Sequence, residues 1–204
     1  MFDTRTIAFI FVLLVLAWSG YQPHDYFTWV LEVTPVFVAI PVLIMTRKRF
    51  PLTPLSYMLI AVHATILMIG GHYTYAEVPL FNWLRDTFDL SRNHYDRLGH
   101  LAQGFVPAMI AREILLRKTP LQAGKMLFFL VTCVCLAISA SYELIEWAVA
   151  EMSGSDATAF LATQGDVWDT QNDMLMALIG SVLAQWWLAE KQARQLHQLL
   201  LVRQ

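Results

Sequence analysis

Six blocks of apolar residues follow one another along the chain, separated by short polar connections. Each block is close to the roughly 20 residues that an α-helix needs to cross a bilayer. The pattern predicts transmembrane helices at 5–21, 28–46, 54–73, 95–116, 124–149 and 168–190. We therefore expect an all-α fold, a polytopic membrane helix bundle with about six transmembrane helices.

The six blocks are predicted to form a single transmembrane helical domain over 1–190. The remainder, 191–204, begins with polar residues and is expected to be a short cytoplasmic tail that forms a helix on the membrane surface. The longest connection joins the third and fourth blocks. Within it, 81–90 is expected to form a short interfacial helix, because Trp and Phe side chains favour the headgroup layer.

Composition supports the membrane assignment. Hydrophobic residues make up 57% of the 204 residues and charged residues only 15%, whereas soluble domains carry about 25% charged residues. The formal net charge of −2 gives no indication of a nucleic-acid partner. Cys133 and Cys135 lie two residues apart, about 200° around a helix, so they do not form a disulfide framework. The expected partner is the lipid bilayer.

The basic residues predict the orientation of the chain. Alternating the six blocks across a membrane places 11 of the 14 basic residues on one side. That set is Arg5, Arg47, Lys48, Arg49, Arg112, Arg117, Lys118, Lys125, Lys191, Arg194 and Arg203. The opposite side receives Arg85, Arg92 and Arg97. By the positive-inside rule the larger set is cytoplasmic, so both termini are expected to be cytoplasmic.

Acidic residues and a histidine recur at the outer ends of three blocks. Asp166, Asp169 and Asp173 begin the last block with i, i+3, i+7 spacing, which places them on one helix face. Asp96 and His100 are four residues apart at the start of the fourth block. Glu143 and Glu146 are three apart near the end of the fifth. Ionisable groups at such positions are costly and mark candidate sites.

Such pairs suggest a site for one or two divalent metal ions, because helix bundles build dinuclear carboxylate sites from comparable pairs. Oxygen ligands with an imidazole suit Mg, Mn, Fe or Zn. The candidate ligands are Asp96, His100, Glu143, Glu146, Asp169 and Asp173. Arg92 and Arg97 are candidates for binding an anionic group. Supporting roles are assigned to His72, Asp166 and Gln171.

Other interpretations of the same residues stay open. The arginines could form structural ion pairs with the acids, because charges within a membrane usually pair. Asp166 could cap the last helix, and His72 could be an interfacial histidine.

Three classes of function fit the pattern. The first is a metal-dependent enzyme that acts on a lipid headgroup, a polyprenyl phosphate or a similar amphiphile. The others are a small ion-coupled transporter or carrier, and a structural membrane protein whose polar cluster fixes helix packing. The pattern leaves the oligomeric state open.

Three segments carry a resemblance to a known family. The segments 94–100, 139–147 and 164–174 resemble signature blocks of the YjdF-like bacterial inner-membrane proteins, and the Gly-Asp-x-Trp-Asp-Thr-Gln motif at 165–171 is the most specific of them. The resemblance covers nearly the whole chain. It implies a multi-pass protein of the bacterial inner (cytoplasmic) membrane, in a family of uncharacterised function, and it implies no mechanism.

Overall fold

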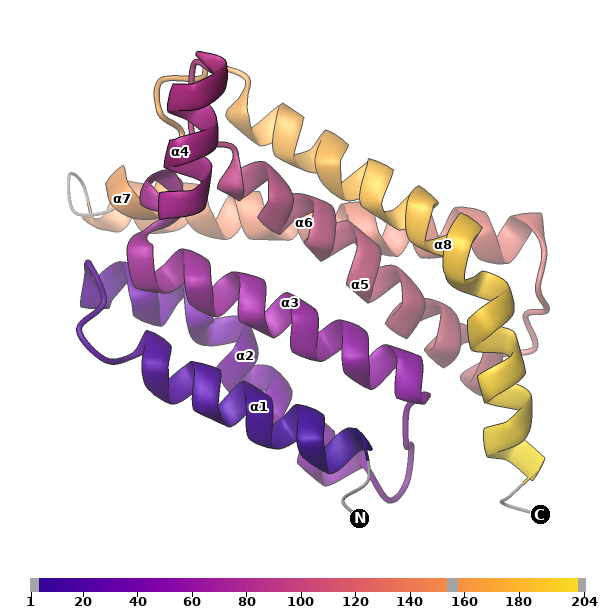
Figure 1. Cartoon of the computed structure of the whole chain (residues 1–204). Helices are drawn as coiled ribbons and strands as arrows, with labels where there is room; N and C mark the ends of the chain where they lie inside the picture. The colour runs from indigo at the N-terminus through magenta and orange to yellow at the C-terminus, as the bar shows by residue number, and fades with distance from the viewer. Residues whose placement is uncertain (1–3, 154–157, 202–204) are drawn as a thin grey trace.

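The computed structural model describes residues 4–153 and 158–201, and every regular element over these ranges is helical. Six long helices run along the bundle in Figure 1. They are α1 (Thr4–Ser19), α2 (Tyr26–Thr46), α3 (Pro54–Tyr73), α5 (Tyr95–Lys118), α6 (Lys125–Ser153) and α8 (Asp169–Leu201). Their bounds match the six apolar blocks closely except at the C-terminal end of α8, and the predicted all-α membrane bundle is confirmed.

Shorter elements lie at the end of the bundle opposite the termini (Figure 1). They are the 3-10 turn η1 (Tyr75–Glu77) and the helices α4 (Pro79–Phe88) and α7 (Thr158–Leu161). The short helix expected within 81–90 is present as α4. It stands across the direction of the long helices, as a helix lying along a membrane interface would.

Local sequence signals explain where the helices begin. The Asp25 carboxylate accepts a hydrogen bond from the Thr28 backbone N–H at 2.6 Å and caps α2. Thr53 caps α3 in the same way, and Pro54 occupies the first turn, where its missing N–H costs nothing. Pro35 and Pro41 lie inside α2, which continues through both of them.

The helices pack as two groups of three. α1 and α2 pack on α3, while α6 packs on both α5 and α8, and α3 joins the groups by packing on α5. The core of the first group consists of Val12, Val33, Val36, Ala61, Ala64 and Met68. The core between α3 and the second group consists of Leu55, Ala108, Met109, Leu127, Val131, Cys135 and Ala184.

The interface between α5 and α8 is the most extensive in the bundle, and two glycines allow it. A Cβ atom at Gly104 would lie 1.9 Å from the carbonyl oxygen of Ala177. A Cβ atom at Gly180 would lie 2.1 Å from the carbonyl oxygen of Leu101. The two backbones are therefore in direct contact, as small residues permit in membrane helix pairs.

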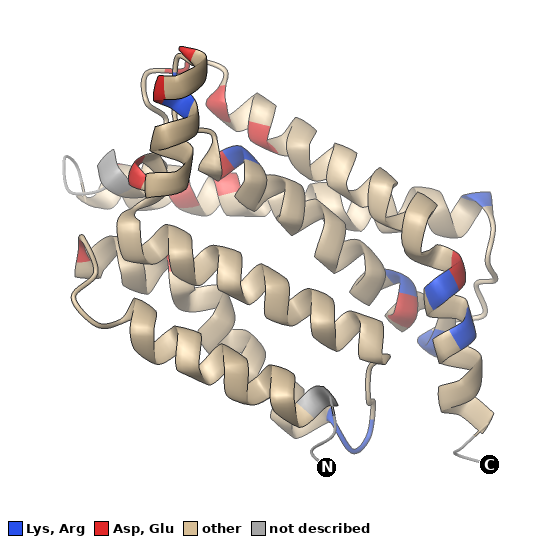
Figure 2. Cartoon of the chain, in the orientation of Figure 1, with Lys and Arg blue, Asp and Glu red and all other residues tan. Residues whose placement is uncertain are grey.

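Charged residues gather toward the ends of the bundle, and the middle of the long helices carries few of them (Figure 2). Leu14, Val62, Phe129 and Trp186 are among many exposed large apolar side chains on the long helices. Among the described residues, α2, α3 and α6 are long and apolar enough to cross a membrane by length and composition, and α1 contributes a shorter apolar helix. Helices α5 and α8 are more polar, but they bury polar groups against each other.

A polar network joins α3, α5 and α8 at the end of the bundle that holds the termini. Glu113 is fully buried and accepts hydrogen bonds from the Thr53 backbone N–H at 3.0 Å and from the Ser56 hydroxyl at 2.9 Å. Arg112 donates to the side-chain oxygen of Gln192 at 2.9 Å. These bonds anchor the three helices to one another at that end.

The expected surface tail differs from the structure. Residues 191–201 continue α8 as one helix, which changes direction near this point in Figure 1. The continuation is amphipathic enough to pack inwards, since Gln192 and Leu196 are buried. Residues 202–204, which include Arg203, lie outside the described residues.

Candidate functional site

The polar ends of α5, α6 and α8 converge at the end of the bundle opposite the termini. We call the group formed by Asp96, His100, Glu143, Asp169 and Asp173 the acidic cluster. All five side chains are buried. The structure thus brings together five of the six candidate metal ligands, from three helices that are distant in sequence.

Arg92, which precedes α5, is buried against the cluster. It donates to Asp169 Oδ1 at 2.5 Å and to the carbonyl oxygen of Ala162 at 3.0 Å. Its second terminal nitrogen lies 3.4 Å from Asp96 Oδ2. Arg92 therefore ties the loop before α8 to the first turns of α5 and α8.

Arg97 pairs with an overlapping set of carboxylates. It donates to Asp166 at 2.9 Å, to Asp169 Oδ1 at 2.8 Å and, through its other terminal nitrogen, to Asp173. Because both guanidinium groups are held by carboxylates of the protein, the structure places these arginines in internal ion pairs rather than at an open anion site. This arrangement corresponds to the ion-pair alternative that the sequence left open.

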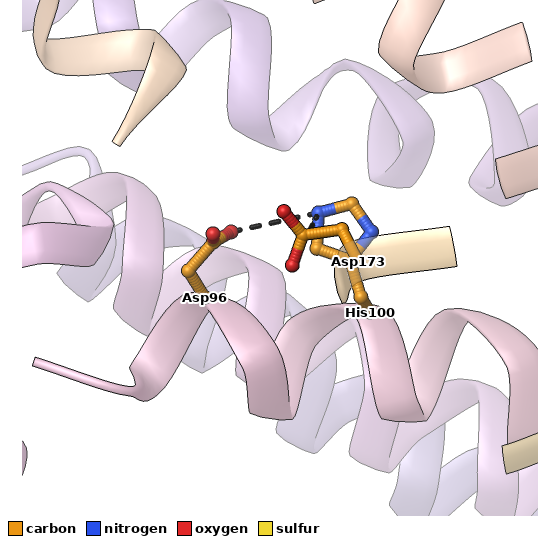
Figure 3. A group of neighbouring side chains, drawn as sticks. All are labelled: Asp96, His100 and Asp173. Carbon is orange, nitrogen blue, oxygen red and sulfur yellow. Dashed lines mark ion pairs between the residues drawn. The ribbon is translucent and has the colours of Figure 1, made fainter. Parts of the chain in front are cut away.

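His100 lies between two carboxylates that the arginines do not fully neutralise. Its Nε2 is 3.5 Å from Asp96 Oδ1 and 3.9 Å from Asp173 Oδ1 (Figure 3). Asp96, His100 and Asp173 each offer one atom that could bind a metal ion, and these three atoms lie within 4.8 Å of one another. Ligands about 2.1 Å from a zinc-sized ion lie roughly 3 to 3.5 Å apart, so these three atoms are spaced somewhat more widely than the ligands of a bound ion.

Glu143 contributes an acceptor that has no partner. Its side chain is buried, and among the described residues Oε1 has no hydrogen-bond donor. This oxygen lies 3.6 Å from His100 Nδ1, which is too long for a hydrogen bond. A buried carboxylate oxygen without a hydrogen bond costs free energy, and the cationic form of His100 is the group that faces it within ion-pair distance.

The balance of charges points the same way. Within the described residues, seven buried or half-buried carboxyl groups lie in or around the cluster, facing two guanidinium groups and one imidazole. They are Glu32, Asp96, Glu143, Glu146, Asp166, Asp169 and Asp173. Five of the seven carboxyl groups are buried, and buried charges are stable only when paired, so the buried carboxyl groups outnumber the cationic groups by two even if the imidazole is charged.

The remaining candidates lie at the edge of the cluster or away from it. Glu146 is half-buried, one turn along α6 from Glu143, and Gln171 is exposed. His72 is outside the cluster: its Nδ1 lies 2.9 Å from the carbonyl oxygen of Ser19 and its ring packs on Trp18. His72 therefore joins α1 to α3 and does not reach the other candidates.

Asp166 lies before α8 and acts on the backbone as well as on the arginines. Its Oδ1 accepts a hydrogen bond from the Trp168 backbone N–H at 2.9 Å, and its Oδ2 accepts from Asn172 at 3.2 Å. The Trp168 hydrogen bond, followed by those of Asn172 and the charges of Arg97 and Arg92, lowers the pKa of Asp166 below its usual value. Asp166 thus stabilises the turn that leads into α8 and also pairs with the arginines.

Two features of this end were missing from the candidates drawn from the sequence. Glu32 of α2 is buried and accepts a hydrogen bond from the Tyr142 hydroxyl at 3.3 Å. A single acid in an apolar block was the available signal. The second is the Gln164 side chain, whose Oε1 accepts a hydrogen bond from the Asn93 backbone N–H and whose Nε2 donates to the Asn93 carbonyl oxygen, both at 2.9 Å. Both lie in loops, where periodicity carries no information.

These observations define a class: a polytopic helical membrane protein with a buried carboxylate–histidine cluster at one end. The family described as "Predicted membrane protein (DUF2238)" matches residues 4–194. The chain belongs to this family. It is 52% identical over 189 residues to the "Inner membrane protein YjdF" of Escherichia coli (strain K12), covering 93% of this chain and 90% of that one. No solved structure matches the chain.

Proposed function

We propose that the acidic cluster binds a divalent metal ion through Asp96, His100 and Asp173, and that the site acts on the headgroup of a lipid-like amphiphile. The observation that carries the metal assignment is the spacing of the three ligand atoms around His100 Nε2. The unpartnered Oε1 of Glu143 supports it, because that oxygen lies beside the same imidazole.

Each residue of the cluster then has a distinct role. Asp96, His100 and Asp173 hold the ion, which would act as a Lewis acid. Glu143 accepts a proton from the attacking water or serves as a further ligand. Arg97 positions Asp173, and Arg92 positions Asp96, as groups around a metal site commonly orient its ligands. Asp169 is paired with the two arginines and does not bind the ion, so its role is to hold these arginines in place.

An amphiphile is supported by the surface around the cluster. Trp83 and Phe88 of α4 and Trp168, two residues after Asp166, are all more than half exposed. Aromatic side chains concentrate at the level of lipid headgroups. The cluster would therefore lie at headgroup depth, where a phospholipid or a polyprenyl phosphate presents its polar group.

The cellular location follows from two observations. The Escherichia coli relative is described as an inner membrane protein, and we place this chain in the bacterial inner membrane. Many basic residues gather at the end of the bundle that holds both termini (Figure 2). The positive-inside rule then makes both termini cytoplasmic and puts the acidic cluster on the outer side.

Metal analysis of the purified full chain tests the site. We expect about one divalent ion per chain in the wild type and loss of that ion in Asp173→Asn and His100→Gln, because each variant removes one of three ligands. Asp86→Asn is the matched control, since Asp86 is an exposed acid on nearby α4. Wild-type protein that contains no stoichiometric metal, and takes up none on titration, would overturn the proposal.

Lipid turnover and ion transport assays distinguish an enzyme from an ion-coupled carrier. The carrier is the alternative function, and the excess of buried carboxyl groups favours it. Glu143→Gln should retain the metal and lose turnover of phospholipids or polyprenyl phosphates in mixed micelles. If wild-type protein with bound metal turns over none of these lipids but moves the ion across liposome membranes, the carrier is correct. If both activities are absent and Glu143→Gln only changes stability, the cluster is structural.

A further inference from the structure

Two apolar cavities flank α2 in the half of the bundle far from the acidic cluster. One of about 500 Å³ lies between α2, α3 and α5, and one of about 480 Å³ lies between α1, α2 and α3. Both are lined by the same small and aliphatic side chains of α2 and α3, on the two sides of α2. The shared residues are Val36, Ala39, Leu43, Ile60 and Ala64.

Basic residues line the end of each cavity nearest the termini. Lys118 and Phe50 belong to the wall of the first cavity, and Arg47 and Lys48 belong to the wall of the second. The Phe50 ring lies 3.6 Å from the Arg117 guanidinium and 5.3 Å from the Lys118 ammonium. Cation–π contacts of this kind hold the positive charges at the mouth of the first cavity.

We propose that this region binds an anionic phospholipid from the leaflet at the basic end, with one acyl chain in each cavity and the phosphate between Arg47, Lys48 and Lys118. The two cavities lie on either side of one helix, as the two chains of a single phospholipid would. Each volume is within the range of about 300–1,000 Å³ typical of ligand pockets. Positive charge at the rim and apolar walls behind it match the charge and shape of this lipid class.

This site is independent of the proposed metal chemistry. Its residues lie within 6–12, 35–50, 52–67 and 106–118. The acidic cluster is formed by the N-terminal parts of α5 and α8 and by Glu143 of α6. Loss of metal binding would therefore leave the lipid site unaffected, and the reverse also holds.

Lipid binding to the full chain in neutral detergent tests the proposal. Native mass spectrometry would count bound phosphatidylglycerol, with phosphatidylcholine and inorganic phosphate as separate probes. We expect selective retention of phosphatidylglycerol. The triple variant Arg47→Gln/Lys48→Gln/Lys118→Gln should weaken it on the order of 100-fold, since each basic residue near the surface contributes about a fivefold effect.

Matched controls separate this site from general attraction to basic protein. Lys191→Gln/Arg194→Gln removes exposed charges from α8, away from both cavities, and should change binding less than twofold. Ala39→Phe adds a ring at a position that lines both cavities and should also reduce retention, whereas Val38→Phe, on the exposed face of α2, should not. Equal retention of phosphatidylcholine, competition by inorganic phosphate alone, or unchanged binding by the triple variant would overturn the proposal.

Discussion

Asp169 and Asp173 lie one turn apart on α8, but their carboxylates meet different partners. Asp169 accepts from both Arg92 and Arg97. Asp173 is paired with Arg97 alone and also faces His100. The sequence treats the two residues as equivalent candidate ligands, and of these two it is Asp173 that lies close to both Asp96 and His100 in the structure.

Residue spacing predicted which side chains share a helix face and could not predict their partners. The i, i+4 relation of Asp96 and His100 follows from helix geometry alone. The reach of Arg92 to Asp169 depends on how the loop before α5 folds against the loop before α8, and Gln164 and Asn93 hold those loops together. No periodic pattern encodes that arrangement.

Asp166 makes a pH-dependent contribution to stability that can be measured. Its pKa is lowered in the folded state by the Trp168 N–H and the neighbouring arginines, so the ionised carboxylate favours folding. This contribution is complete above the usual aspartate pKa of about 3.9 and is lost as the pH falls through the lower folded value. Asp166→Asn should therefore melt at a lower temperature than wild type at pH 7, and the difference should close below about pH 3.9.

Thermal melts in detergent between pH 3 and pH 8 would show this convergence. Asp86→Asn provides a comparison, because Asp86 is exposed on α4 and pairs with its neighbour Arg85. The difference in melting temperature between wild type and Asp166→Asn could instead be constant across this pH range. That result would show that the effect comes from a weaker hydrogen bond to the Trp168 backbone N–H, and not from the charge of the carboxylate.

At the scale of elements, the contact between α5 and α8 carries the site, because these two helices supply Asp96, His100 and Asp173. The existence of both helices was predictable from their apolar blocks. Their pairing was not, since six helices can pack in many orders and the apolar pattern does not specify which helix contacts which. In the structure, Gly104 and Gly180 lie where the two backbones touch, which explains why these positions lack a side chain.

Gly104→Ala tests how closely the two helices approach. Alanine favours a helix over glycine by about 1 kcal/mol, but the new methyl group would meet the Ala177 carbonyl oxygen at 1.9 Å. Overpacking of this kind costs about 1–3 kcal/mol or more, so we expect net destabilisation. Unfolding in denaturing detergent would measure it.

Gly124→Ala is the control for this substitution, because nothing lies within 4 Å of a Cβ atom at Gly124. Its stability should stay within about 0.5 kcal/mol of wild type. If Gly104→Ala were as stable as Gly124→Ala, the α5–α8 backbones would be farther apart than described.

At the scale of the whole molecule, hydrophobic blocks and basic residues predicted most of the architecture. Bilayer thickness and the need to satisfy every backbone group leave few alternatives to a helix bundle. The even number of long helices places both termini at one end in Figure 1. The exception is the C-terminal part of α8, where buried Gln192 and Leu196 extend the helix beyond the predicted span.

Cysteine labelling in intact cells tests the orientation. In a background with Cys133 and Cys135 replaced by Ala, Asp89→Cys at the end of α4 should react with a membrane-impermeant maleimide. Lys191→Cys on α8 should react only after the cells are permeabilised. The opposite pattern would place the acidic cluster on the cytoplasmic side, and labelling of a Phe129→Cys control would indicate damaged membranes.

Helices α5 and α8 are fixed together by buried polar groups at both ends, and this sets a hydrophobic thickness. From Asp173 to Gln192, α8 rises about 28 Å at 1.5 Å per residue, which is close to the roughly 30 Å of a bilayer's hydrocarbon core. The ion pairs at one end and the Gln192 contacts at the other prevent either helix from sliding along its neighbour. In a thinner bilayer the pair must tilt as one body, so the depth of the acidic cluster follows the thickness of the membrane.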